Sequence, residues 1–150
     1  MMRCVDTDFL IDILNDESGV GEIVEQLDGN REYFTTTLSA FELLAGAYQL
    51  GKEKLDAANL LLSRFQIFEV NKFAADETAR IYADLRRKGK EIPMRDAMIA
   101  GIAKINGCSL ITRDTGHFKT DLKFHNTRVF LSFLVLINIW GWGYYDGVFL

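Results

Sequence analysis

The sequence is poor in the residues that build covalent and soft-metal sites, with two cysteines, two histidines and one proline among 150 residues. Cys4 and Cys108 lie in apolar, strand-like stretches, so we expect reduced core residues rather than a disulfide, which is rare in the cytosol. His117 and His125 stand apart from the acidic residues described below and are not expected to bind metal. Only five residues precede Asp6, so no leader sequence is expected and the protein is predicted to be cytoplasmic.

The chain also lacks a large excess of either charge. Its formal net charge of -4 argues against a protein that coats nucleic acid through bulk charge, although local basic patches can still hold phosphates. With 49% hydrophobic and 25% charged residues, the composition is that of a globular chain, and 150 residues suit one domain with one core.

Strand-like and helix-like segments alternate along the chain. Strands are predicted at residues 3–5, 33–37, 65–70 and 108–112, with helices between them. Ser39 is expected to cap the helix that runs to about Gly51, and Pro93 to open the helix before the fourth strand. This order predicts an α/β fold, a three-layer sandwich with a mostly parallel central sheet covered on both faces.

Four acidic residues stand where apolar segments end and the chain turns, namely Asp6, Glu42, Asp96 and Asp114. Carboxylates at the carboxyl ends of parallel strands point into the crevice where α/β sheets bind ligands. Several together repel one another unless a hard cation neutralises them, and oxygen ligands suit Mg²⁺ or Mn²⁺. The pattern therefore indicates a divalent metal site.

Each acid also has a purely structural interpretation. Ser39 and Glu42 have the spacing of a capping box, in which the glutamate would bond the first backbone N–H of its own helix. Asp6 and Asp96 can be helix caps, and Asp114 can be a turn residue that bonds its own backbone. Caps that arise independently need not all fall at one sheet edge, so the conjunction favours the metal site.

The same residues carry a family resemblance. Val5-Asp6-Thr7, the helix start at 39–43, the segment 96–100 and the segment 110–114 resemble, in this order, the motifs of PIN-domain nucleases, and the chain looks most like a VapC-type toxin over about residues 2 to 125. The resemblance implies a metal-dependent endoribonuclease that cleaves single-stranded RNA. It assigns metal binding and catalysis to Asp6, Glu42, Asp96 and Asp114, and supporting positions beside the metal ligands to Thr112 and Asp8. It also implies a homodimer and an antitoxin protein that covers the acidic cleft.

Basic residues near the acids are candidates for contacts with RNA phosphates: Arg86, Arg87, Lys88, Lys90, Arg95 and Arg113. The alternative is a solvated helix end whose cations complement the helix dipole. Five aromatic residues have the periodicity of a core rather than of a base-stacking platform: Phe41, Phe65, Phe68, Phe73 and Tyr82.

Two other functions remain open at this point. Val5-Asp6-Thr7-Asp8 also resembles the DxD signature of haloacid-dehalogenase-type phosphatases, although Leu10 stands where that family has threonine and Glu42 would have no role. A catalytically silent domain could instead bind RNA or a protein through the same cleft. Metal-dependent cleavage of RNA or of a small phosphoester separates these alternatives.

The C-terminal segment differs in composition from the rest. No charged residue occurs from Val129 to Tyr145, which sets a domain at residues 1–128 apart from an apolar tail at 129–150. A membrane span needs about 20 apolar residues, and the run is interrupted by Ser132, Asn138 and two glycines. No membrane anchoring is expected. The tail is predicted to pack as an extra element, to cover a dimer surface or to be foreign to the domain.

A chain that ends at Arg128 should therefore keep metal-dependent RNA cleavage. Removing a long apolar run should also raise solubility or change the oligomeric state, because exposed apolar runs drive association. Gel filtration and a cleavage assay on the full and shortened chains measure both effects. An unfolded product would show that the tail belongs to the core.

Overall fold

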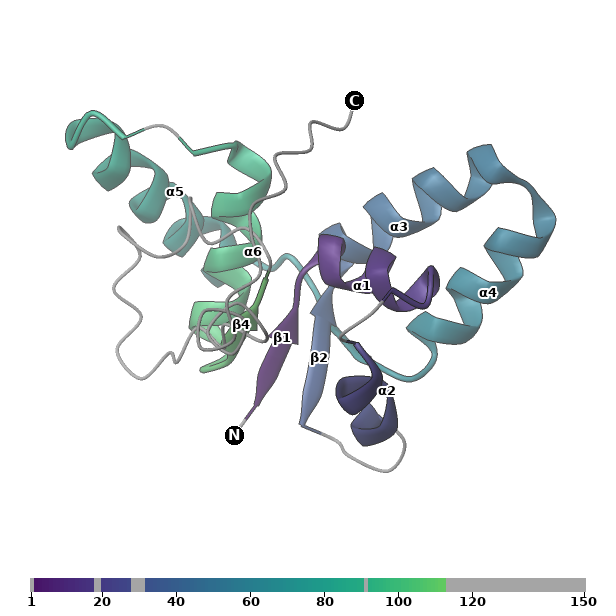
Figure 1. Ribbon diagram of the computed structural model, residues 1–150. Coiled ribbons are helices and arrows are strands. Elements are labelled where there is room, and N and C mark those ends of the chain that lie inside the picture. The colour runs from purple at the N-terminus through teal and green to yellow at the C-terminus, as the bar shows by residue number, and fades with distance from the viewer. Residues whose placement is uncertain (1, 18–19, 28–31, 91, 113–150) are drawn as a thin grey trace, which may run out of the picture.

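The structure is a computed structural model that describes residues 2–17, 20–27, 32–90 and 92–112 (Figure 1). Its strands are β1 (Arg3–Val5), β2 (Tyr33–Thr36), β3 (Gln66–Phe68) and β4 (Ser109–Ile111). Its helices are α1 (Thr7–Leu14), α2 (Gly21–Leu27), α3 (Thr37–Leu50), α4 (Lys52–Leu62), α5 (Lys72–Arg87) and α6 (Met94–Ile105). The predicted tail, and its boundary at residue 128, lie outside the described residues.

The four strands form one parallel sheet in the order β3-β2-β1-β4. β1 is central: Cys4 pairs with Phe34 of β2 on one side and with Leu110 of β4 on the other. In Figure 1 the helices α5 and α6 lie on one side of β1 and β2, and α1, α3 and α4 lie on the other. The predicted three-layer α/β sandwich with a parallel sheet is confirmed.

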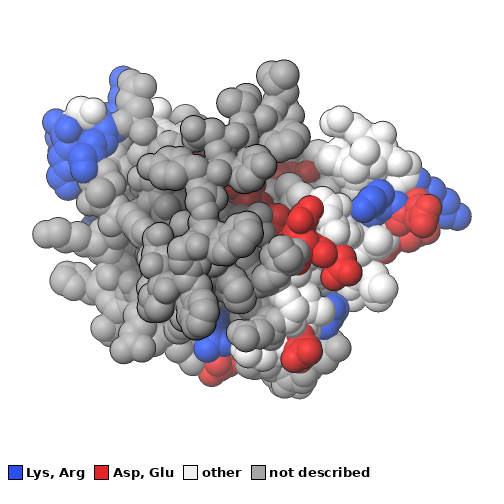
Figure 2. All heavy atoms as spheres, viewed as in Figure 1, with Lys and Arg blue, Asp and Glu red and all other residues white. Residues whose placement is uncertain are grey.

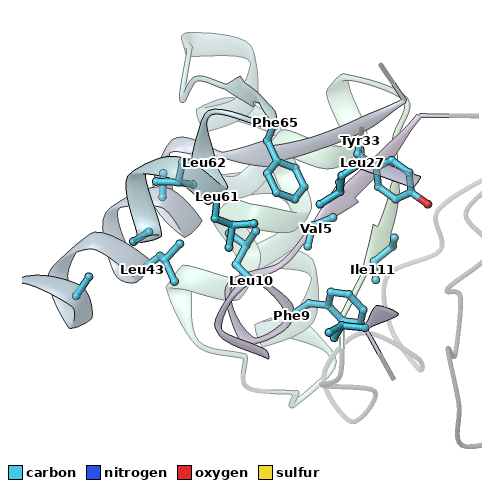
Figure 3. Packing of buried hydrophobic residues seen from close by; sticks show 14 residues of the cluster. Val5, Phe9, Leu10, Leu27, Tyr33, Leu43, Leu61, Leu62, Phe65 and Ile111 are labelled. Atoms are coloured by element: carbon cyan, nitrogen blue, oxygen red, sulfur yellow. The ribbon is translucent and has the colours of Figure 1, made fainter. Parts of the chain in front are cut away.

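Neighbouring residues of β1 supply the two halves of the core, because side chains alternate between the faces of a strand. Val5 belongs to the cluster that packs against α1, α2, α3 and α4, which also contains Phe9, Leu10 and Leu43 (Figure 3). Cys4 belongs to the cluster on the α5 and α6 side, with Leu85 and other buried residues. Both cysteines are buried free thiols, as expected.

The start of α3 differs from the prediction. The cap is Thr36, whose side-chain oxygen accepts a hydrogen bond from the Ser39 backbone N–H at 3.0 Å, and Ser39 is a fully buried residue inside the first turn. Thr36 ends β2 in an extended conformation, with φ -111° and ψ 156°, which is the backbone geometry of an N-cap. The capping role therefore falls to the threonine three residues earlier.

Two of the five aromatic residues predicted to be core are not. Phe41 and Phe73 are 65% and 76% exposed, whereas Phe65 is buried and Phe68 stacks on Phe34 with ring centroids 4.5 Å apart. In α3 the buried positions follow the stripe of Ala40, Leu43 and Ala47, and residue 41 lies off it. The expectation was wrong for these two residues because the helices turn different faces to the core than their apolar spacing suggested.

The helices α5 and α6 approach each other closely. A Cβ atom placed on Gly101 of α6 would lie 2.2 Å from Thr78 Oγ1 and 3.0 Å from Thr78 N in α5. Beside this contact, Lys104 Nζ lies 2.6 Å from Glu77 Oε1, an ion pair between the same two helices. Within the described ranges, no helix has the length and apolar character needed to cross a membrane.

Gly101→Ala should consequently lower the free energy of unfolding by about 1–3 kcal/mol, the usual effect of overpacking. The added methyl group meets backbone atoms of α5 as well as the Thr78 side chain, so the helices must separate to accept it. Urea denaturation measures the change.

Gly46→Ala in α3 is the matched control, since nothing lies within 4 Å of its Cβ position. It should raise the free energy of unfolding by roughly 0.5–1 kcal/mol, the usual gain from replacing a helical glycine. A Gly101→Ala protein as stable as the parent would contradict the close contact between α5 and α6.

Candidate active site

The acidic residues gather at the carboxyl edge of the sheet. Asp6 directly follows β1, Glu42 lies in the helix that follows β2, and Asp96 lies in the first turn of α6. Asp6 and Asp96 are 7% and 4% exposed, and the Glu42 side chain is 18% exposed. Residues far apart in the sequence thus place three carboxylates in one partly buried region.

Asp6 is held at both of its carboxylate oxygens. Oδ1 accepts a hydrogen bond from the Thr7 backbone N–H at 2.6 Å, and Oδ2 accepts one from Thr112 Oγ1 at 2.8 Å. Thr112 directly follows β4, which is paired with β1, so the sheet brings together two residues that are 106 positions apart. The structure thus places Thr112 against Asp6. Asp114, beside which the resemblance placed Thr112, lies outside the described residues, so the supporting role of Thr112 stays a prediction.

The pKa of Asp6 is raised from 3.8 to about 6. Burial is the main cause, because it penalises the charged carboxylate. The hydrogen bonds from Thr112 and Thr7 lower the pKa, and the negative charges of Asp8 and Asp96 raise it again. Asp8 is exposed, so it acts on Asp6 through its charge.

Glu42 is bound to residues outside its own helix. Thr7 Oγ1 donates a hydrogen bond to Glu42 Oε2, and Arg95 Nη1 lies 3.2 Å from Glu42 Oε1. The capping box considered for Ser39 and Glu42 is therefore wrong, because Thr36 caps α3 and the Glu42 carboxylate faces the sheet edge.

Arg95 pairs with two of the acids at once. Its Nε donates to Asp96 Oδ1 at 3.0 Å while its Nη1 lies 3.2 Å from Glu42 Oε1, and its side chain is 52% exposed. The hydrogen bond to Asp96 and the charge of Glu42 raise the pKa of this guanidinium above its ordinary value. Asp96 does not cap α6, since the N-cap position is Pro93.

Thr7 is a site residue that the sequence reasoning did not single out. Its backbone N–H binds Asp6 and its hydroxyl binds Glu42, so one buried residue ties the two acids together. The available signal was a hydroxyl residue immediately after the first acid. That signal is weak, because threonine in this position also suits an ordinary helix start.

The basic stretch lies at the end of α5. Arg87 and Lys88 pair with Asp84 at 3.4 and 2.5 Å, and the Arg86 guanidinium lies 5.8 Å from the centre of the Tyr82 ring. Figure 2 shows basic side chains at the upper left, where α5 ends in Figure 1, and acidic side chains near the middle of the same face. The pairs with Asp84 agree with a solvated helix end. Contacts of Arg86, Arg87, Lys88 and Lys90 with RNA stay a prediction, and Arg113 lies outside the described residues.

The donor chemistry of this region suits a hard divalent cation, since Asp6, Glu42 and Asp96 all offer carboxylate oxygens. Asp96 is close enough to Asp6 for its charge to raise the Asp6 pKa. Within the ranges described, however, no three His, Cys, Asp or Glu side chains already form a group that could hold a metal ion. The residue types fit the ion, and the fourth acid, Asp114, lies outside the described residues.

Known proteins resemble the chain in sequence and in fold. The PIN domain family model matches residues 3–123. The tRNA(fMet)-specific endonuclease VapC of Shigella flexneri is 30% identical over 86 residues, which make up 56% of this chain and 65% of that protein. The match therefore spans less than two thirds of that relative.

Two solved structures have the same fold. DNA-bound VapBC from Salmonella typhimurium has a TM-score of 0.73 at 23% identity, covering 85% of this chain and 96% of that chain. FitAcB from Neisseria gonorrhoeae has a TM-score of 0.67 at 26% identity, covering 79% and 91%.

The raised pKa of Asp6 predicts a specific dependence of stability on pH. Between 3.8 and about 6 the folded protein keeps a proton on Asp6 that the unfolded chain releases. The resulting stabilisation, of about 3 kcal/mol, is complete below about pH 4 and is lost as the pH rises through about 6. Asp6→Asn removes this titration, so its stability should fall less over that range than the parent's.

Urea denaturation in the presence of EDTA, from about pH 4 to about pH 7, measures the difference. Asp76→Asn is the matched control, because it removes an exposed aspartate whose side chain is 74% accessible. Parallel pH curves for the parent and Asp6→Asn would contradict the raised pKa.

Proposed function

The chain belongs to the PIN-domain family, and from this membership and the acidic site we propose that it is a metal-dependent endoribonuclease that cleaves single-stranded RNA. The observation that carries the proposal is the convergence of Asp6, Glu42 and Asp96 at one sheet edge, linked through Thr7 and Arg95. The endonuclease relative from Shigella flexneri supports the same reaction class.

Asp6, Glu42, Asp96 and Asp114 would hold Mg²⁺ or Mn²⁺. When bound, such an ion activates water as the nucleophile and relieves negative charge on the phosphate. Thr7 and Thr112 orient the Asp6 carboxylate, and Thr7 also orients Glu42, which limits how the oxygens can turn. Above about pH 6 the Asp6 carboxylate is mostly ionised and offers an anionic ligand.

RNA would approach this edge of the sheet along basic side chains. Phosphate contacts hold a nucleic acid in position without reading its sequence, and guanidinium groups suit them best. We assign this role to the residues at the α5 end and next to the acids: Arg86, Arg87, Lys88, Lys90, Arg95 and Arg113.

We further propose that the protein is the toxin of a toxin–antitoxin pair, acting in the cytoplasm as a homodimer that a cognate antitoxin restrains. The support comes from solved structures with this fold, one of which is a toxin–antitoxin complex from Klebsiella pneumoniae. That structure has a TM-score of 0.66 and is 20% identical to this chain.

A second candidate is a catalytically silent domain that binds RNA or a protein. It is favoured by Arg95, whose guanidinium pairs with both Glu42 and Asp96. The phosphatase alternative is wrong, since the chain belongs to the PIN family and Glu42 lies among the acids.

The purified protein should cut single-stranded RNA internally with Mg²⁺ or Mn²⁺ and stop when EDTA is added, because the ion supplies the nucleophile. Asp6→Asn and Asp96→Asn should each lower the cleavage rate by at least about 100-fold, beyond the loss usual for residues that only support metal ligands. Gel analysis of end-labelled RNA measures the rate.

Asp76→Asn, purified identically, controls for contaminating nucleases and should cleave like the parent. Cleavage that survives EDTA and both site substitutions would remove the metal-nuclease proposal. Absence of cleavage together with retained RNA binding would favour the silent domain.

A further inference from the structure

The Arg95 guanidinium contacts two of the carboxylates that a divalent cation would bind. One guanidinium uses two of its nitrogens on two different carboxylates, at 3.0 Å from Asp96 Oδ1 and 3.2 Å from Glu42 Oε1. These two acids come from α6 and α3, so the bridge also joins two helices on opposite faces of the sheet. The oxygens that would ligate a divalent cation are thus the oxygens that already face a positive charge.

The guanidinium relieves the repulsion among the acids in the absence of metal. Glu42 and Asp96 lie within ion-pair distance of the same guanidinium. Burial, and to a smaller extent the charge of Asp96, raises the pKa of the neighbouring Asp6. The planar guanidinium presents N–H donors in a geometry that matches carboxylate oxygens, and it stays positively charged at any ordinary pH. Because half of the Arg95 side chain is exposed, it can swing into solvent without unfolding its helix.

We propose that Arg95 is a built-in counter-ion of the acidic site, and that a divalent cation binds Glu42 and Asp96 by displacing its guanidinium. The inference rests on the proposed metal site and adds a residue that sets its affinity. The metal ion then replaces the guanidinium. Its affinity is lower than it would be without Arg95, because the two ion pairs of Arg95 must break.

The exchange predicts that weakening the bridge tightens metal binding. Arg95→Gln should lower the Kd for Mn²⁺ roughly three- to tenfold, a modest change because partly exposed ion pairs are weak. Arg95→Lys keeps the charge but loses the planar fork, so its Kd should fall between those of the parent and Arg95→Gln. If only overall charge mattered, the lysine variant would bind like the parent.

Isothermal titration calorimetry of the full chain with MnCl₂ at low salt measures the three values of Kd. Arg80→Gln is the matched control: it removes the same charge from an exposed ion pair on α5, with Asp76 at 3.2 Å. Its Kd should stay within about twofold of the parent's, since Arg80 pairs with Asp76 and Glu77 of its own helix rather than with the acids of the site.

Thermal melting supplies a second readout that does not need activity. In EDTA, Arg95→Gln should melt about 2–4 °C lower than the parent, because Glu42 and Asp96 lose their counter-ion. Saturating Mn²⁺ should raise its melting temperature by more than it raises the parent's, since tighter binding to the folded state stabilises it more.

The possible results distinguish the counter-ion role of Arg95 from the existence of the metal site. A Kd for Arg95→Gln equal to or higher than the parent's would overturn the counter-ion role and leave the metal site standing. Binding of Mn²⁺ by neither the parent nor Arg95→Gln would overturn the metal site and this proposal with it. Tighter binding by Arg95→Gln, with Arg95→Lys in between and Arg80→Gln unchanged, would support the exchange.

Discussion

Parallel pairing of the central strand β1 is the constraint on which the site depends. Its neighbours β2 and β4 run in the same direction, so all three strands end at the same edge. Asp6, which follows β1, therefore meets Thr112, which follows β4, across more than a hundred intervening residues. An antiparallel neighbour would have carried its own end to the opposite edge, and the acids would not have met.

Crowded carboxylates at that edge create an electrostatic cost that the protein reduces with neutral and cationic partners. Thr7 and Thr112 donate hydrogen bonds to the acids, and Arg95 contributes a positive charge between Glu42 and Asp96. These contacts do not offset the effect on Asp6, whose pKa remains about 6, mainly because the carboxyl group is buried and secondarily because Asp8 and Asp96 are negatively charged. A divalent cation at the proposed site would stabilise the charged carboxylates, because it reduces the repulsion between them.

The order of elements and the positions of the acids could be predicted because local rules decide them. Alternating apolar runs predicted the four strands and the helices between them. Most of the observed boundaries lie within one or two residues of the predicted ones. Asp6 follows β1 directly, Glu42 lies in the helix after β2, and Asp96 lies in the first turn of α6. In a parallel α/β sheet these places lie toward the same edge.

What the sequence determined by itself is the alternation of strands and helices and the place of Asp6 directly after the first strand, because hydrophobic periodicity and turn chemistry act over a few residues. Only the tertiary structure decided between partners that are equivalent locally. Thr36 rather than Ser39 caps α3, Glu42 binds Thr7 and Arg95 rather than its own helix, and Phe41 faces outward. The cap depends on where β2 ends, at Thr36. The partners of Glu42 and the exposure of Phe41 depend on which distant helix or strand packs nearby, and no short window of sequence contains that neighbour.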